Sequence, residues 1–500
     1  MKSSYAATFA VAALALLLAV PVSAQERYDV VIRNGRVMDP ETGLDAVRNV
    51  GINGQTIVAI SDDELEGERI IDAEGLVVAP GFIDLHAHGQ TNRANEFQAR
   101  DGVTTALELE SGVPSLAGYL GGRSGDAIIN YGATVNLGTS RVSVMPQFAT
   151  LAAEAQEIAT SEDEEDQARL RELEWELMAG NYENLPKDLY PELHDRIRQG
   201  MAEGALGIGM AHQYYPGASH DEIFRVFELA GAEDFPIYTH VRSMGIQAVQ
   251  EVLANAMATD APLHIVHLNS SSLGDIGTNL ALVKGAQEAG VDVTTEVYPY
   301  TAASTSLQSA IFDDGFRERL GIDYSDIQWQ DTGERLTEET FHSYREQGGV
   351  VIIHMMREEW IQAALEADHV MVASDGMPYA AGAHPRSAGT FSRFLGRYVR
   401  DMGTVSLMNG LRKITLMPAQ RLEAISAQAA RKGRVQIGAD ADLTIFDPNR
   451  ILDTATFEDD LSFSIGVEHV LVNGVLVVRD GENVEGARPG QAVVGRRTVF

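Results

Sequence analysis

The middle of the chain alternates short apolar runs with helical patterns, and this alternation limits the fold more than any other feature. The runs have the length of buried strands, and helical patterns at residues 246–257 and 279–289 lie between them. Repeated strand–helix units favour parallel strands. The candidate strands are residues 79–88, 104–109, 133–137, 206–210, 236–240, 263–267, 291–295, 350–354 and 370–375. They are numerous enough for an α/β protein built on an eight-stranded (β/α)₈ barrel like the TIM barrel.

Both ends of the chain show strand patterns without intervening helices. Turn sequences such as Arg33-Asn34-Gly35 adjoin these strands. The strand candidates are residues 29–32, 55–60, 442–448 and 469–478. We therefore predict one small β-sandwich domain built from residues 25–79 and 431–500, with the catalytic barrel at residues 80–430.

The N-terminus has the composition of a secretory signal peptide. Lys2 is followed by an apolar run over residues 6–20 and then by a small-residue segment that ends at Ala24. The apolar run is too short to span a membrane comfortably. We predict that residues 1–24 are removed on export to the periplasm or the cell exterior, and that the mature protein has no membrane span.

Cysteine is absent from the chain, and acidic residues are in large excess. Without cysteine the protein forms neither a disulfide nor a thiolate–metal bond. The formal net charge is −34 at pH 7, and a surface of this charge repels nucleic acid and anionic membranes. We therefore expect no nucleic-acid partner, whereas the oligomeric state is not indicated by the sequence.

An acidic segment at residues 161–166 opens a predicted helix in the first half of the chain. Acidic residues favour a helix N-terminus electrostatically. The apolar stripe of this helix consists of Leu170, Leu173, Leu177 and Met178. We interpret the segment as a solvated helical insertion and not as a metal-binding tract.

Four histidines and one aspartate lie at the ends of predicted strands. His86 and His88 follow an apolar run, and because side chains alternate along a strand, both point to the same side. Neutral imidazole is the commonest metal ligand. His240, His267 and Asp375 close three further strands. Since parallel β/α barrels build their active sites at the C-terminal strand ends, the pattern predicts a metal site formed by all five residues.

This order of histidines and aspartate resembles the amidohydrolase superfamily, and several motifs resemble its D-aminoacylase branch, the N-acyl-D-amino-acid deacylases. The motifs occupy residues 102–105, 204–209, 239–243, 297–302, 384–391 and 438–443. The resemblance covers essentially the whole chain after the signal peptide. It implies a distorted (β/α)₈ barrel with a small β-sandwich domain, one or two zinc ions, and hydrolysis of an amide bond in a small-molecule substrate.

One departure from this branch concerns a metal ligand. The branch carries a zinc-binding cysteine just after the Gly-Val-Thr-Thr strand, and here that position falls near Ser111, a poor zinc ligand. Glu110 is one residue away and can supply an oxygen, while Glu108 shares its strand face and is the alternative. Other amidohydrolases bridge two metals with a carboxylated lysine. The only lysine between residues 100 and 260 is Lys187, whose surroundings do not resemble a barrel strand.

These observations predict two neighbouring metal positions. The tighter zinc is expected on His240, His267 and Glu110, and the neighbouring position on His86, His88 and Asp375. Zinc lowers the pKa of bound water to about 7. Asp375 is expected to accept the proton of the attacking water and to pass it to the leaving nitrogen, acting first as general base and then as general acid.

A second departure concerns the substrate. The branch usually has a lysine two residues after the second strand-end histidine, and Asn269 occupies that position here. Arg242 and Arg386 are candidates to hold a substrate carboxylate, because an arginine fork binds a carboxylate bidentately. Tyr298 is a further candidate substrate contact.

The favoured reaction is therefore deacylation of an N-acyl-D-amino acid. Two alternatives stay open at the level of sequence. One is a dipeptidase, cyclic amidase or lactonase that uses the same metal site. The other, from a different functional class, is a non-catalytic secreted binding protein.

Overall fold

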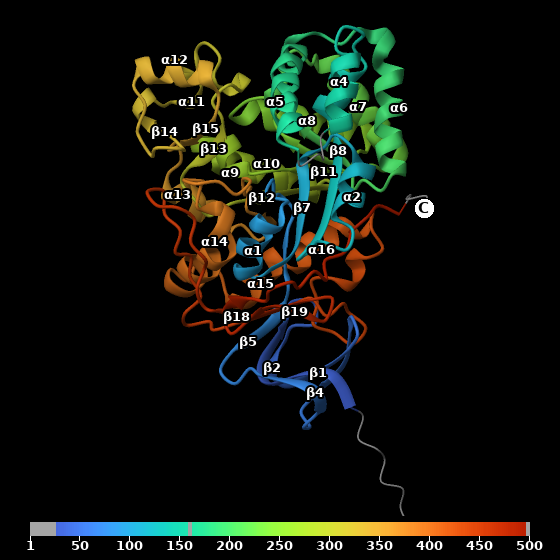
Figure 1. Cartoon of the computed structure of the whole chain (residues 1–500), viewed down its shortest axis with the longest axis vertical. Helices are drawn as coiled ribbons and strands as arrows, with labels where there is room; N and C mark the ends of the chain where they lie inside the picture. The colour runs from blue at the N-terminus through green and yellow to red at the C-terminus, as the bar shows by residue number, and fades with distance from the viewer. Residues whose placement is uncertain (1–26, 159–162, 497–500) are drawn as a thin grey trace, which may run out of the picture.

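The computed structural model of the chain describes residues 27–158 and 163–496. The predicted signal peptide and the first two residues of the acidic segment lie outside the described residues. Figure 1 shows a β domain at one end of the molecule, the barrel in the middle, and two groups of elements above the barrel. In the described part of the chain, no helix is both long enough and apolar enough to cross a membrane.

The barrel is an eight-stranded parallel sheet, as predicted. In spatial order its strands are β6 (Phe82–Asp84), β7 (Val103–Val113), β8 (Asn130–Asn136), β9 (Ile208–Ala211), β10 (Ile237–His240), β11 (Leu263–Ile265), β12 (Val293–Val297) and β16 (Val370–Val372). Just beyond β6 and β16 the ring is drawn together by backbone contacts, since the His88 N–H donates to the Gly376 carbonyl at 2.8 Å and Ala87 forms a parallel bridge with Gly376. All C-terminal strand ends therefore face one mouth.

Residues 350–354 contain a strand, as expected, but this strand is not part of the barrel. β15 (Val350–Ile353) pairs antiparallel with β13 (Ala303–Ser306) and β14 (Ile327–Trp329) in a separate sheet. With α11 (Phe316–Leu320) and α12 (Glu338–Gln347) it encloses a hydrophobic core of its own. The apolar pattern of β15 is satisfied by this small core, and for that reason it resembles a buried barrel strand in the sequence.

Helices follow most barrel strands, and most of these helices lie outside the barrel (Figure 1). They are α1 (Asn92–Arg100), α2 (Leu116–Arg123), α3 (Leu137–Ser143), α6 (Tyr190–Ala202), α7 (His220–Glu233), α8 (Ile246–Thr259), α9 (Leu268–Ser272), α10 (Ile276–Glu288), α13 (Glu358–Glu366), α14 (Arg386–Arg393), α15 (Leu407–Ile414) and α16 (Leu416–Glu423). The helices expected at residues 246–257 and 279–289 correspond to α8 and α10.

The predicted helical insertion is present above β7 and β8 (Figure 1) as α4 (Ala149–Ile158) and α5 (Glu164–Met178). The side chain of Asp163 caps α5 by accepting from the backbone N–H groups of Glu165 and Asp166. Of the predicted apolar stripe, Leu173 is fully buried.

The β domain joins the two ends of the chain in one nine-stranded sheet. Its strands are β1 (Arg27–Asp39), β2 (Leu44–Asn53), β3 (Thr56–Ser61), β4 (Glu66–Asp72), β5 (Val77–Pro80), β17 (Leu443–Phe446), β18 (Val467–Val472), β19 (Val475–Arg479) and β20 (Glu482–Asn483). The ends meet where β17 pairs antiparallel with β5. The predicted fold class, a barrel with a small β domain built from both termini, is confirmed.

Candidate metal centre

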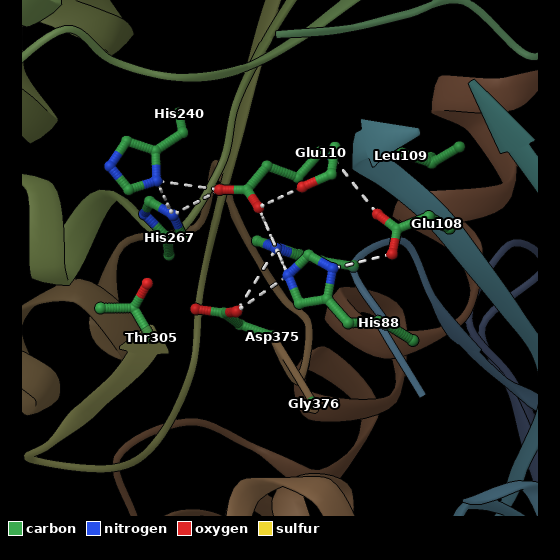
Figure 2. A network of polar contacts seen from close by, with 12 residues as sticks. His88, Glu108, Leu109, Glu110, His240, His267, Thr305, Asp375 and Gly376 are labelled. Atoms are coloured by element: carbon green, nitrogen blue, oxygen red, sulfur yellow. Dashed lines mark hydrogen bonds and ion pairs between the residues drawn. The ribbon is translucent and has the colours of Figure 1, made fainter. Parts of the chain in front are cut away.

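The residues predicted as metal ligands meet at the mouth of the barrel (Figure 2). They are His86 and His88 after β6, Glu110 on β7, His240 at the end of β10, His267 after β11 and Asp375 after β16. All are buried except His88, whose side chain is 17 % exposed. Parallel strands that end at the same rim bring these distant positions together.

Glu110 lies between two pairs of histidines. Its Oε1 atom is 2.9 Å from His240 Nδ1 and 3.0 Å from His267 Nε2. Its Oε2 atom is 3.4 Å from His86 Nε2 and 3.3 Å from His88 Nε2. Two groups that can hold a metal ion therefore share this one carboxylate.

Asp375 faces His86 and His88 from the side opposite Glu110. Its Oδ1 atom is 3.4 Å from His86 Nε2 and 3.5 Å from His88 Nε2. Its Oδ2 atom lies 2.9 Å from Arg386 Nη1. One oxygen thus points to the histidines, while the other is held by a buried cation.

Each histidine has its second ring nitrogen bound by another polar group, and the sequence reasoning missed most of these partners. The pairs are His86 with Glu296, His88 with Glu108, His240 with Gln213 and His267 with Ser271. Such partners fix the ring orientation and the tautomer of a metal-binding histidine. The sequence held one signal for such a partner, because Glu296 is a glutamate near the end of the buried strand β12.

The structure separates the roles of two acidic residues near the histidine pair of β6. Glu108 Oε2 is 2.7 Å from His88 Nδ1, so this residue orients a ring. Asp84 instead accepts from the backbone N–H groups of His86 and Ser374. Asp84 therefore ties β6 to the segment after β16.

The charges around Glu110 and Asp375 keep both carboxyl groups ionised. Burial alone would raise the pKa of Glu110, but the charge of His86 and the contacts with His240 and His267 hold that pKa well below its usual range. Burial likewise opposes ionisation of Asp375, whereas the charges of Arg386 and His86 hold its pKa far below the ordinary value.

Two of the six residues have a left-handed backbone, which non-glycine residues adopt rarely. The φ angles are 31° at His267 and 51° at Asp375. Backbone strain of this kind clusters at functional sites, where contacts with the surrounding structure hold the strained conformation in place. Both residues follow a short barrel strand, so the strained turn directs each side chain into the mouth.

The donor set is suited to zinc. The Nε2 atoms of His86 and His88 face each other at 3.3 Å, and His267 Nε2 faces His240 Nδ1 at 2.9 Å. Imidazole nitrogens that converge beside carboxylate oxygens provide the nitrogen and oxygen ligands that zinc binds in catalytic sites. The arrangement fits two ions that share Glu110.

A cavity of about 370 Å³ opens over these residues. One wall is apolar and comes largely from the small antiparallel sheet and its helices. Its apolar members are Met244, Ile311, Leu320, Ile353 and Met355. Among the described residues, no lysine or arginine lines this cavity.

The three predicted substrate contacts lie outside the lining of this cavity. Arg242 binds Glu251 through Nε and Nη2 and donates to the Ala218 carbonyl. Arg386 is fully buried behind the cavity, with its guanidinium carbon 4.7 Å from the centre of the Tyr298 ring. Arg386 is thus the cation next to the metal-binding residues, while Arg242 is neutralised elsewhere.

The fold and the site together define a barrel enzyme with a buried histidine–carboxylate centre. The profile of the amidohydrolase family matches residues 69–478, and the chain belongs to this family. It is a metal-dependent hydrolase of carbon–nitrogen bonds other than peptide bonds.

Known relatives point to the deacylase branch. The chain is 29 % identical to the D-aminoacylase of Alcaligenes xylosoxydans xylosoxydans, over 91 % of this chain and 95 % of the relative. A solved D-aminoacylase, studied for its binuclear metal centre, has a TM-score of 0.77 and 27 % identity, covering 94 % and 100 % of the two chains. The N-acyl-D-glutamate deacylase of Bordetella bronchiseptica, solved with zinc and a phosphonate inhibitor, shares the fold at a TM-score of 0.78 and 24 % identity, with the same coverage.

Proposed function

We propose that the protein is a zinc-dependent deacylase of N-acyl-D-amino acids with apolar side chains. The observation that carries the proposal is Glu110, whose two oxygens each face a histidine pair. His240 and His267 would hold one zinc ion with Glu110, and His86, His88 and Asp375 would complete the second position. Zinc bound there would activate water and polarise the substrate carbonyl.

Asp375 is the proton carrier in this proposal. Its Oδ1 atom faces the histidines, so it is placed to accept a proton from the attacking water. The same oxygen can then donate the proton to the leaving nitrogen. Arg386 holds the other oxygen and thereby fixes the direction of the carboxyl group.

The amino-acid part of the substrate is assigned to the side of the cavity formed by β13. Ser304 lines the cavity there, and its hydroxyl has no hydrogen-bond partner among the described residues. Arg386 Nη2 donates to the Ser304 carbonyl, so a positive charge lies directly behind this residue. A substrate carboxylate near Ser304 would be favoured by both groups. The apolar wall beside β13 suits an apolar amino-acid side chain.

A substrate panel with the zinc-loaded enzyme tests the function. N-acetyl-D-leucine and N-acetyl-D-methionine should be hydrolysed faster than their L isomers, dipeptides, hydantoins and lactones. Asp375→Asn should lower kcat by about 10²-fold or more while zinc stays on His240, His267 and Glu110, because asparagine tolerates the left-handed backbone and the lost carboxylate belongs to the second position. Preferred hydrolysis of a dipeptide, a cyclic amide or a lactone would replace the deacylase assignment.

We also propose that the protein is exported. The support is the sequence of residues 1–24, with its basic start, apolar run and small residues before the expected cleavage site. Expression of the full chain in a bacterial host, followed by N-terminal sequencing of the fractionated protein, tests this. A mature chain that begins at Gln25 outside the cytoplasm is expected, and an uncleaved cytoplasmic chain would contradict export.

A further inference from the structure

A second cavity of about 420 Å³ lies next to the metal centre, between the helical insertion and the barrel. Most of its lining is apolar, and three members of the stripe on α5 contribute to it. These three are Leu170, Leu177 and Met178. Among the described residues, the charged members of its lining are Arg196, on α6, and Glu203, next to the end of α6.

The two cavities meet at the first turn of α3 and at Asn181. Gly138, Thr139 and Asn181 line both cavities. Asn136 lines the metal-side cavity and caps α3 by accepting from the Thr139 N–H at 2.8 Å. Gly138 has no side chain to close the boundary, and Thr139 is exposed. The shared residues make this turn the boundary that an extended group would cross to reach the second cavity from the metal centre.

We propose that the second cavity binds the acyl chain of the substrate, so that the enzyme prefers amides of medium- and long-chain fatty acids. This inference rests on the proposed function. The amino-acid part is assigned to the β13 side because of Ser304 and Arg386, so the acyl group points to the opposite side, where α3 and Asn181 lie. A lining that is apolar for the most part, with few charged members, matches an aliphatic chain better than a charged acyl group.

The decisive experiment measures kcat/KM for the zinc-loaded enzyme with N-acetyl-, N-hexanoyl-, N-decanoyl- and N-tetradecanoyl-D-leucine. Each methylene that enters the cavity should raise kcat/KM by about three- to fourfold, according to the transfer free energy of a methylene group. We expect at least a 100-fold preference for the decanoyl over the acetyl substrate. A flat or falling series would overturn the inference, while hydrolysis of the acetyl substrate would leave the deacylase assignment intact.

Three substitutions on α4 test whether the preference for long acyl chains arises in the second cavity. Ala152 and Ala155 line the second cavity, whereas Ala153 lies between them, is exposed and does not line it. Ala155→Phe, with Ala152→Phe as a second variant, should lower kcat/KM for the decanoyl substrate at least tenfold and leave the acetyl substrate within twofold. Ala153→Phe should change neither. Equal losses for both substrates, or the same loss in Ala153→Phe, would contradict the assignment.

Binding of decanoic acid, measured by calorimetry, separates this inference from the proposed function. Wild-type protein should bind decanoate, and Ala155→Phe should weaken that binding at least tenfold. If decanoate binds in this way while no N-acyl amino acid is hydrolysed, the cavity assignment stands and the deacylase function fails. If decanoate does not bind and the acetyl substrate is hydrolysed, the cavity assignment fails alone.

Discussion

At the scale of single residues, Glu110 connects the two halves of the site. The sequence predicted this residue as a ligand of one position, from the absence of cysteine and of a suitable lysine. The structure adds that Oε2 reaches the second histidine pair, a contact that depends on how β6 and β7 pack and that no local pattern encodes. Glu296 was missed for a related reason, since its partner His86 is 210 residues away.

Replacing Glu110 or Glu108 by glutamine should affect zinc binding to different extents. Glu110→Gln removes a charged oxygen from both metal positions, so we expect total zinc content to fall and the affinity of each position to weaken by about 10–100-fold or more. Glu108→Gln removes the charged partner of His88, and the amide oxygen can still accept from the Ser111 N–H, so the position formed by His240 and His267 should stay filled. Competitive chelator titrations measure the zinc affinity of both variants. A larger loss in Glu108→Gln than in Glu110→Gln would reverse the roles.

At the scale of elements, the site depends on how closely β7 and β9 approach each other. β7 carries both glutamates, and its pairing with β8 is irregular between Glu108 and Val113. Gly209 on β9 lies against this irregular segment. A Cβ atom built there would be 2.5 Å from Thr134 Oγ1 and 2.7 Å from the Glu110 carbonyl oxygen.

Gly209→Ala should therefore displace the backbone that carries Glu110. We expect a loss of about 1–3 kcal/mol in the free energy of unfolding, as for other overpacked cores, together with weaker zinc binding. Gly285→Ala is the matched control, because Gly285 lies inside α10 and an added Cβ would have no atom within 4 Å. That variant should be more stable by up to about 1 kcal/mol. Urea unfolding and zinc titration of both proteins give the comparison, and unchanged zinc affinity in Gly209→Ala would contradict this role.

The sequence predicted the positions of strands and helices better than it predicted which strands pair with one another. The strand ends at His240, His267 and Asp375 could be identified because apolar runs stop there and barrel topology brings strand ends together. β15 has the same apolar character, yet it pairs with β13 and β14, since a buried run does not indicate which core buries it. The second cavity could not be predicted from the sequence either, because it forms only where α4 and α5 pack above β7 and β8.

At the scale of the whole molecule, buried carboxylates join segments that are far apart in the sequence. Asp442, next to β17, accepts from Lys432 Nζ at 2.6 Å and from Asn130 Nδ2 of the barrel at 2.9 Å. Asp101, at the end of α1, accepts from the backbone N–H groups of Phe391 and Ser392 and from the Ser464 hydroxyl. These contacts hold the C-terminal third of the chain against the first barrel strands and their helices.

Asp101 should make the stability of the protein depend on pH. Burial raises the pKa of Asp101 to about 7 from 3.8, although the hydrogen bonds from Phe391, Ser392 and Ser464 oppose the shift. The folded state therefore binds the proton more tightly than the unfolded state. Stability from this group is fully present below about pH 4 and is lost as the pH rises to about 7. The size of the loss is roughly 4 kcal/mol, at 1.4 kcal/mol per pKa unit.

Other carboxyl groups titrate over the same range, so the informative quantity is the difference between the wild type and Asp101→Asn. Asparagine stays neutral at every pH. Relative to the wild type, the variant should gain stability steadily between about pH 4 and pH 7 and show a constant difference above that range. Urea unfolding of both proteins at pH 4, 5.5, 7 and 8 measures this difference. A constant difference across the series would mean that Asp101 has the same proton affinity in the folded and unfolded chain, and that its three hydrogen-bond donors fully offset the cost of burying its charge.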